Sequence, residues 1–312
     1  MKRKFLIHPN TLKQRTCIQK IYIKNLYFLA ILFIIAFVIF SLSGCAFRSV
    51  KRAKNIPYNT NNHDSGSIQK LNVFAPAHKK LCPVFIFIYG GNWNSGKKSL
   101  YSFFGSRMAR KGIVTVIPDY PKSPKAKYNK MADNIALAVQ WTKAHIAEYG
   151  GDPNRIFISG HSAGGHLAAL VSIKSEYFDN LHMANPIKGL ILIDGAGLDM
   201  YGYLKEEQFD EGNTYIKTFT NDPAVWKQAT PLYSLHNGMP PMLIYRGEKT
   251  YPSIINSNEK FVDSLKQYDT KFEYQVLPGK KHVPIILQFF NTRNKRYKEI
   301  ISFMERKRMK SE

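Results

Sequence analysis

The segment Gly160–Gly164 constrains the fold of this chain most, because its sequence Gly-His-Ser-Ala-Gly stands between a strand-like run, 155–159, and a helix-like run, 165–170. A sharp turn from a strand into a helix needs small residues around the central serine, and it lifts the serine side chain above the edge of the sheet. The N-terminus of the following helix favours negative charge that develops beside it. The pattern therefore predicts that Ser162 lies exposed on a strand–turn–helix unit, as a nucleophile would.

The chain around this segment alternates strand-like and helix-like runs, which is typical of a largely parallel sheet with helices on both faces. Short apolar runs predict strands at 84–88, 113–117, 155–159, 190–193, 242–245 and 272–277, and helical spacing predicts helices at 130–147, 255–268 and 295–308. The stretch 200–238 has weak periodicity and predicts loops and short helices over the site. We therefore expect one α/β domain over residues 69–312.

The first 44 residues differ in composition from the rest and resemble a secretory leader. They carry seven Lys and Arg and no Asp or Glu, and an apolar run extends from Leu26 to Phe40. The following Leu42-Ser43-Gly44-Cys45 resembles a bacterial lipobox, which implies cleavage after residue 44 and a lipid on Cys45. An uncleaved anchor is the alternative, because a helix from Leu26 to Leu42 would span roughly 25 Å. Both interpretations place the domain in the cell envelope, outside the cytoplasmic membrane.

Residues 45–68 are polar and weakly patterned, and they predict a flexible tether between the lipid and the domain. The chain has a formal net charge of +23, and +16 remains after the leader. The Lys and Arg are scattered without a recognition motif, which argues against a nucleic-acid partner. Beyond the leader and Cys45, Cys82 is the only cysteine, so we expect no disulfide.

Two glycines and one alanine are the candidates for holding a negatively charged oxygen. Gly90 and Gly91 follow the predicted strand 84–88, and paired glycines let backbone N–H groups approach a substrate oxygen closely. Together with the N–H of Ala163, they would form an oxyanion hole. The alternative is an ordinary Gly-Gly turn that ends the strand.

His282 is the candidate base for Ser162, because an unassisted serine is a poor nucleophile at neutral pH. It lies in a loop after the last predicted strand and before an apolar segment. His161 and His166 flank the serine too closely to reach over its Oγ atom, so we assign them to packing and local hydrogen bonds.

The segments Tyr89–Trp93, Asp119-Tyr120, Glu148–Pro153 and Gly160–His166 together resemble the esterase branch of the α/β hydrolases, which includes kynurenine formamidases and prenylcysteine methylesterases. The resemblance covers roughly residues 70–308. It implies the α/β-hydrolase fold and a cofactor-free, metal-free acyl-enzyme mechanism that uses Ser162 and His282. It also implies a small ester or amide as substrate.

The chain departs from the pattern of this branch at two positions. Tyr89 stands where the glycine motif usually begins with histidine, and Thr250 stands where an aspartate is expected after the penultimate strand. Threonine cannot stabilise an imidazolium by charge, and loss of the acid of a triad lowers turnover by about 10⁴-fold. The sequence therefore predicts either a substitute acid or weak activity.

The substitute acid should lie between Ser162 and His282 in the sequence, near the carboxyl end of a strand. Glu248 is the preferred candidate, because it lies two residues before Thr250 and its longer side chain offsets part of the displacement. Asp194, with a possible turn-capping role, and Asp199 are the alternatives, and a Ser–His dyad without an acid is the third.

The sequence thus predicts a membrane-tethered serine hydrolase that cleaves a small carboxylic ester or amide through an acyl-enzyme. The alternative is a weakly active or inactive descendant that uses the cleft to bind a ligand or partner. Thr250 favours the alternative, whereas Ser162, His282 and the paired glycines favour the enzyme.

Overall fold

The computed structural model describes residues 31–34, 49–59 and 68–306 of the chain. The chain separates into two units, Met1–Ser49 and Val50–Glu312. In the first unit, residues 31–34 are helical and exposed. No helix among the described residues is both long and apolar enough to cross a membrane. The predicted cleavage site and Cys45 lie outside the described residues, so the leader stays a prediction.

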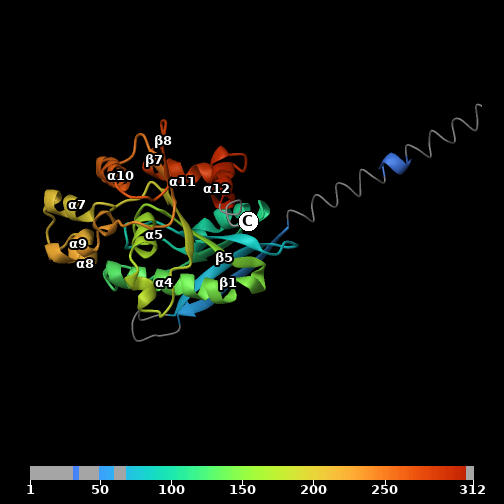
Figure 1. Ribbon diagram of the computed structural model, residues 1–312, viewed down its shortest axis with the longest axis horizontal. Coiled ribbons are helices and arrows are strands. Elements are labelled where there is room, and N and C mark those ends of the chain that lie inside the picture. The colour runs from blue at the N-terminus through green and yellow to red at the C-terminus, as the bar shows by residue number, and fades with distance from the viewer. Residues whose placement is uncertain (1–30, 35–48, 60–67, 307–312) are drawn as a thin grey trace, which may run out of the picture. The chain divides into compact units, whose positions relative to one another are not determined.

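The second unit is built on one eight-stranded sheet with the strand order β1-β2-β4-β3-β5-β6-β7-β8 (Figure 1). The six strands from β4 to β8 in this order run parallel, whereas β1 and β2 are antiparallel to their neighbours. The strands are β1 Val50–Asn59, β2 Gln69–Pro76, β3 Cys82–Ile88, β4 Val114–Pro118, β5 Gly151–His161, β6 Ile187–Ile193, β7 Met242–Gly247 and β8 Phe272–Leu277.

The inner strands consist of continuous apolar runs because helices cover both faces of a parallel sheet. Every residue of β4 is buried, and so are the last five residues of both β3 and β6. All six strands predicted from the sequence are present, and the predicted α/β class is confirmed.

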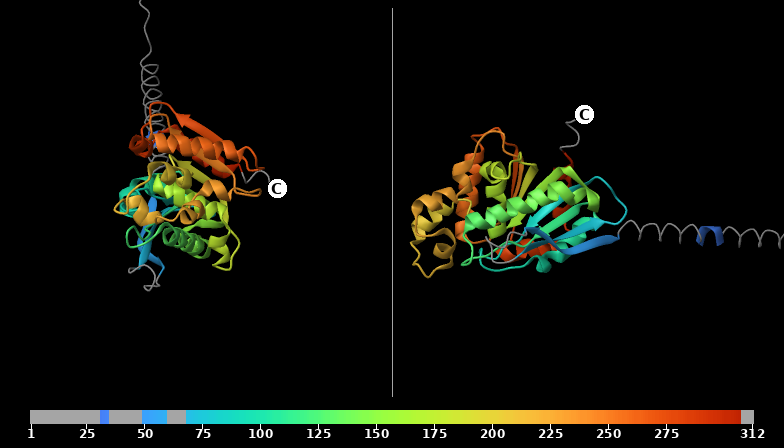
Figure 2. Two further views of the ribbon diagram at one scale, coloured as in Figure 1. Left: turned by 90° about the vertical axis from the view of Figure 1, so that its left-hand side faces the viewer. Right: turned by 90° about the horizontal axis from the view of Figure 1, so that it is seen from below.

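Helices cover both faces of the sheet (Figure 2). On one face, Phe104 of α3 packs against Phe85 and Phe87, and Phe303 of α12 packs against Phe157. On the other face, α4 and α5 pack against each other and against β5. The helices are α3 Ser102–Arg110, α4 Tyr128–His145, α5 Ala163–Ile173, α6 Glu176–Asp179, α10 Pro252–Leu265, α11 His282–Leu287 and α12 Lys295–Glu305, with the 3-10 turns η1 Lys98–Tyr101, η2 Ile146–Tyr149 and η4 Gln288–Phe290.

The stretch between β6 and β7 forms short helices, as its weak periodicity predicts. These helices gather at one end of the domain (Figure 1) and include side chains that line the cavity described below. They are α7 Met200–Glu207, α8 Thr214–Phe219, α9 Pro223–Gln228 and the 3-10 turn η3 Pro231–Ser234.

The tether predicted for residues 45–68 is wrong for Val50–Asn59, which form the edge strand β1. Its register with β2 runs from Val50 opposite Pro76 to Asn59 opposite Gln69. The prediction missed this strand because half of its side chains are exposed and its sequence is mostly polar, so it shows little apolar alternation. Backbone pairing and a few contacts at its end hold it instead. The Tyr58 hydroxyl donates to the Asp119 carbonyl oxygen at 2.5 Å, and the Asn59 amide donates to Asn134 of α4 at 2.9 Å.

We expect a chain that begins at Ser49 to keep the stability of the domain and a chain that begins at Ile68 to lose part of it. The shorter chain lacks the β1 ladder and the buried Tyr58, whose burial alone contributes about 2 kcal/mol. The midpoint of thermal unfolding should therefore fall by about 4 °C or more between the two chains, as measured by circular dichroism. Equal midpoints would mean that β1 is a dispensable tether after all.

Candidate active site

The turn at Ser162 joins β5 to α5 in a conformation that only small neighbours permit. Ser162 has φ 56° and ψ −126°, a backbone conformation that is costly for a residue with a side chain. A Cβ atom on Gly160 would lie 2.1 Å from the Gly164 carbonyl oxygen, and one on Gly164 would lie 2.2 Å from the Ile88 carbonyl oxygen. The two glycines therefore let the backbone close tightly, and the turn presents Ser162 to a cavity, as the sequence predicts.

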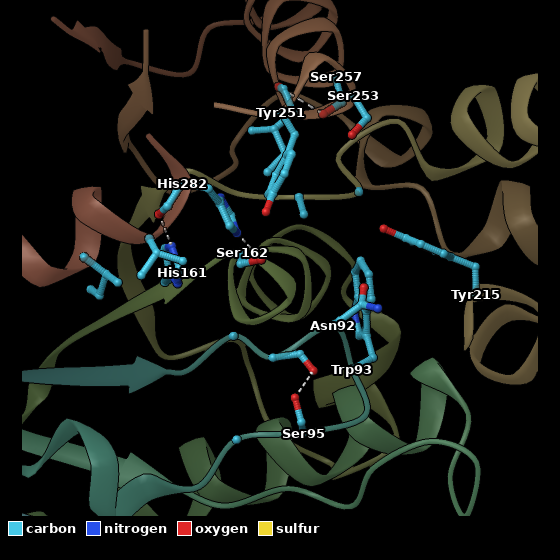
Figure 3. A pocket seen from close by; sticks show the side chains of 18 of the residues that line it. Asn92, Trp93, Ser95, His161, Ser162, Tyr215, Tyr251, Ser253, Ser257 and His282 are labelled. Carbon is cyan, nitrogen blue, oxygen red and sulfur yellow. Dashed lines mark hydrogen bonds between the residues drawn. The ribbon is translucent and has the colours of Figure 1, made fainter. Parts of the chain in front are cut away.

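Three side chains from separate segments form a continuous hydrogen-bonded series. The Nε2 atom of His282, the first residue of α11, lies 2.8 Å from Ser162 Oγ (Figure 3). The Nδ1 atom of the same ring lies 2.6 Å from Oδ2 of Asp194. A carboxylate only accepts hydrogen bonds, so Nδ1 carries the proton and Nε2 is free to accept the hydrogen of the serine hydroxyl.

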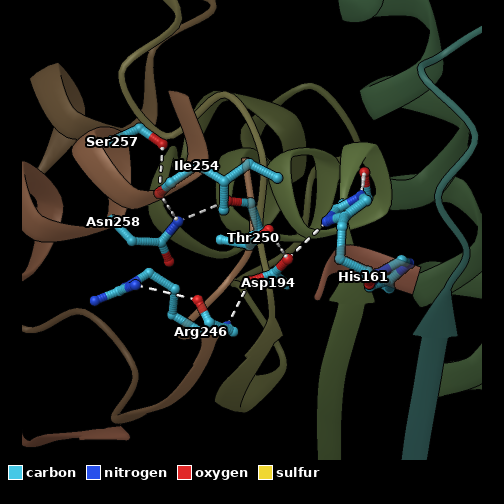
Figure 4. Close-up of polar contacts among 11 residues, drawn as sticks. His161, Asp194, Arg246, Thr250, Ile254, Ser257 and Asn258 are labelled. Atoms are coloured by element: carbon cyan, nitrogen blue, oxygen red, sulfur yellow. Dashed lines mark hydrogen bonds and ion pairs between the residues drawn. The ribbon is translucent and has the colours of Figure 1, made fainter. Parts of the chain in front are cut away.

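Asp194 follows the last residue of β6 and is completely buried. Its Oδ1 accepts a hydrogen bond from the Gly247 backbone N–H at 2.7 Å. Its Oδ2 accepts one from the Thr250 hydroxyl at 2.5 Å in addition to that from His282 (Figure 4). A buried charge persists only when such donors replace the water that it has lost. The three donors therefore satisfy the buried carboxylate oxygens and fix their orientation toward the imidazole ring.

The preference for Glu248 as the acid is wrong. Its side chain is exposed, and its Oε2 accepts a hydrogen bond from the Gly279 N–H at 2.7 Å, away from His282. Asp199 does not serve either, because its side chain accepts from the N–H of Gly202 in the first turn of α7 and pairs with Lys260 at 2.7 Å. The structure thus selects Asp194 from the alternatives that the sequence left open.

From the sequence, Thr250 counted as evidence against a complete triad. In the structure, its hydroxyl donates to the carboxylate of Asp194, the residue that contacts His282. The sequence signal for Asp194 was its place at the carboxyl end of an apolar strand, but the same signal also fits a residue that caps a turn. Strands β6 and β7 are parallel neighbours with Ile193 opposite Tyr245, so the residues that follow them meet at one edge of the sheet. Nothing in the sequence indicates that these two strands are adjacent.

The predicted oxyanion donors lie around the serine. Gly90 and Gly91 line the same cavity as Ser162, and a Cβ atom on Gly90 would lie 2.8 Å from the Ser162 Cβ. Ala163 is the first residue of α5, where backbone N–H groups have no acceptor within the helix. The three residues therefore lie next to Ser162, where their backbone N–H groups are the candidate donors.

The two histidines that flank the turn have structural contacts, as the sequence predicts. His161 stacks on the His282 ring at 4.8 Å, and its Nε2 lies 3.1 Å from the His282 carbonyl oxygen. His166 accepts from Trp93 Nε1 at 3.2 Å and donates to the Ala229 carbonyl oxygen at 2.7 Å. Burial lowers the pKa of both His161 and His166 to about 4, so both rings stay neutral at physiological pH.

Ser162 and His282 open into a cavity of about 1040 Å³, large enough for a small organic substrate. Figure 3 shows Ser162 within it, with His282 and His161 on one side and Tyr215 on the other. No group of three or more metal-ligating side chains occurs among the residues that the structure describes.

Curated proteins with similar sequences are named as esterases. The isoprenylcysteine alpha-carbonyl methylesterase ICME of Arabidopsis thaliana is 27% identical over 242 residues, which are 70% of this chain and 55% of that protein. Esterase LipC of Mycobacterium tuberculosis is 28% identical over 216 residues, which are 65% of this chain and 53% of that protein. The chain thus spans about half the length of these relatives.

Solved structures share the fold at low sequence identity. A truncated carbohydrate esterase from gut microbiota has a TM-score of 0.72 at 18% identity, over 85% of this chain and 98% of its own. Esterase B from Lactobacillus rhamnosis has a TM-score of 0.67 at 18% identity, over 87% of this chain and 91% of its own. These similarities confirm the predicted α/β-hydrolase fold.

The sequence profile of the BD-FAE family matches residues 71–261, which run from within β2 to beyond β7 and include the turn at Ser162 and Asp194. Because this match covers more than half of the chain, the protein belongs to the BD-FAE family.

Proposed function

We propose that this chain is a serine hydrolase that cleaves a carboxylic ester through an acyl-enzyme intermediate. The observation that carries the proposal is the series Ser162–His282–Asp194, with distances of 2.8 and 2.6 Å, at the edge of a substrate-sized cavity. The esterase names of its relatives support the same reaction. An amide would use the same groups.

In the first half of the reaction, Ser162 Oγ attacks the ester carbonyl carbon while its proton passes to Nε2 of His282. The imidazolium that forms is stabilised by the Asp194 carboxylate at Nδ1. Backbone N–H groups of Gly90, Gly91 and Ala163 are the candidate donors to the carbonyl oxygen as it becomes negative. One such donor contributes roughly 3–4 kcal/mol to the transition state in a hydrolase.

In the second half, the proton on Nε2 passes to the departing alkoxide, and the alcohol leaves. A water molecule then gives a proton to the same nitrogen and attacks the acyl carbon. The proton returns to Ser162 Oγ as the carboxylic acid is released. His282 therefore acts first as a base and then as an acid, and it keeps one tautomer because Asp194 holds Nδ1.

The competing hypothesis of an inactive binding protein rested on Thr250 at the expected position of the acid. Asp194 removes this support, because its carboxylate reaches the imidazole from the neighbouring strand and Thr250 donates to it. No other feature of the site favours a purely binding role over catalysis.

We also propose that the protein is a lipoprotein of the cell envelope, with lipid on Cys45 and residues 1–44 removed. The support is the basic leader, the apolar run and Leu42-Ser43-Gly44-Cys45. Such an anchor would hold the domain at a membrane surface, to which the positive charge of the domain would add attraction for anionic lipids.

The first test concerns the nucleophile. Replacement of Ser162 by alanine should abolish labelling by a fluorophosphonate probe, because the atom that the probe modifies is lost. The matched control is Ser253→Ala, which changes another serine that lines the cavity and should be labelled like the wild type. Intact labelling of Ser162→Ala, read by mass spectrometry, would exclude Ser162 as the nucleophile.

The second test concerns the acid. Asp194→Asn should lower kcat by about 10⁴-fold, because the amide favours the wrong tautomer of His282. Glu248→Gln is the control and should stay near wild type, since its side chain faces solvent. In the double variant Asp194→Asn/Thr250→Asp, the new carboxylate extends toward the same ring nitrogen. Its kcat should therefore be at least tenfold higher than that of Asp194→Asn alone. Full activity of Asp194→Asn would leave a Ser–His dyad as the mechanism.

The third test concerns the leader. Mass spectrometry of membrane-extracted protein should find an acylated N-terminal peptide that begins at Cys45. Cys45→Ser should retain the leader, whereas Cys17→Ser should be processed normally, because residue 17 lies within the segment removed. Recovery of peptides from residues 5–24 in stoichiometric amounts from the wild type would indicate an uncleaved anchor.

A further inference from the structure

The walls of the cavity differ in chemistry on its two sides. On the side of the short helices, the lining includes Tyr203 and Tyr215 and the carboxylates of Asp199 and Glu207. On the side of η1, α3, α11 and η4, the lining is largely hydrocarbon. We call this second side the apolar arm, and it consists of Leu100, Phe103, Val283, Ile286, Leu287 and Phe290.

The apolar arm exposes an unusual amount of hydrophobic surface. Leu100, Val283, Leu287 and Phe290 are each 46–59% exposed. Within residues 49–59 and 68–306, nine large hydrophobic side chains are exposed, and five of them line this one cavity, these four and Tyr251. Isolated exposed hydrophobic residues are ordinary on a protein surface, but a contiguous group at a cavity indicates a surface that an apolar partner covers.

The arm is held in place by contacts between α3 and η4. The rings of Phe103 and Phe290 stack with their centroids 3.8 Å apart. The guanidinium of Arg107 lies over both rings, at 5.4 and 5.2 Å, and donates a hydrogen bond to the Phe289 carbonyl oxygen at 2.8 Å. Phe290 is exposed and Phe103 is half-buried, so these contacts restrict both rings, keep the wall preformed and lower the entropic cost of binding.

We infer that the apolar arm binds an unbranched hydrocarbon chain of the substrate, so that the preferred esters carry a medium or long alkyl chain on one side of the carbonyl. This inference rests on the proposed function. Ser162 and the arm line one cavity, and α11 begins at His282 and continues into Val283, Ile286 and Leu287. A chain lying along α11 therefore starts at the reacting carbonyl. Each methylene that leaves water should multiply kcat/KM by a factor of up to about four.

Two series of esters test the inference and identify which part of the ester holds the chain. The first series is the p-nitrophenyl esters from acetate to decanoate, and the second is the alkyl acetates from ethyl to decyl, all below their micellar concentrations. We expect kcat/KM to rise at least tenfold from two to eight carbons in one series. A rise in the first places the acyl chain in the arm, and a rise in the second places the alcohol there. Flat or falling values in both series would overturn the inference.

A pair of leucine substitutions links the preference to the arm. Leu287→Asp places a charge in the arm, and its ratio of kcat/KM for the eight-carbon ester over the two-carbon ester should fall at least tenfold. The matched control is Leu81→Asp, which changes a leucine that is 71% exposed and does not line the cavity, and its ratio should stay unchanged. Leu287→Met should keep most of the preference, because it changes shape but not polarity. An unchanged ratio in Leu287→Asp would contradict the assignment.

Fluorophosphonate labelling separates failure of this inference from failure of the proposed function. A wild-type protein that is not labelled and cleaves no ester would contradict the hydrolase itself. A wild-type protein that is labelled and cleaves acetate, but shows no preference for longer chains, would contradict the apolar arm alone.

Discussion

The carboxylate of Asp194 is completely buried, and the geometry around the serine depends on the donors that make this burial tolerable. The Gly247 N–H and the Thr250 hydroxyl come from the end of β7 and the loop after it, and the ring of His282 comes from the start of α11. The Asp194 carboxylate therefore binds donors that lie between 53 and 88 residues away in the sequence. If one donor is lost, the buried carboxylate is left partly unsatisfied, and its orientation toward His282 is no longer fixed.

The nucleophile is held by a different constraint, which is steric. Ser162 adopts a positive φ. The carbonyl of Gly164 leaves no room for a side chain at Gly160, and the carbonyl of Ile88 leaves none at Gly164. The parallel strands on both sides of β5 supply the rigid frame that maintains this strained turn. The hydrogen bonds of Asp194 orient His282, the strained turn orients Ser162, and these two residues, the proposed base and nucleophile, meet at a contact of 2.8 Å.

The residues around Ser162 and His282 differ in what they contact: some position the two side chains, and others line the cavity. His161 and His166 stay neutral through burial, so the charge that appears during the proposed reaction remains on His282. His161 also stacks on the ring of His282 and contacts its carbonyl oxygen, which adds a second hold on the residue that begins α11. The remainder of that helix carries part of the apolar arm. The proposed proton transfer and the proposed binding of the hydrocarbon chain therefore share one short helix, α11.

The sequence by itself determined the parts of this protein that depend on local pattern. The glycines around Ser162, the continuous apolar strands and the position of His282 after the last strand are all properties of neighbouring residues, and each has its expected place in the fold. Two features of the structure were not predicted correctly from the sequence. The polar edge strand β1 is held by backbone pairing and shows little apolar alternation. The candidate acid was sought close to Thr250 in the chain, whereas Asp194, just after β6, is the carboxylate that contacts Thr250 and His282.

Only the tertiary structure could decide that choice. Strands β6 and β7 lie side by side and in parallel, so a carboxylate at the end of either strand can face the same imidazole nitrogen. Glu248 is nearer to the expected position in sequence, but its side chain leaves the sheet toward solvent and binds the Gly279 N–H. The backbone direction at the end of each strand decides which carboxylate reaches His282. That direction follows from packing between distant segments, which local sequence does not encode.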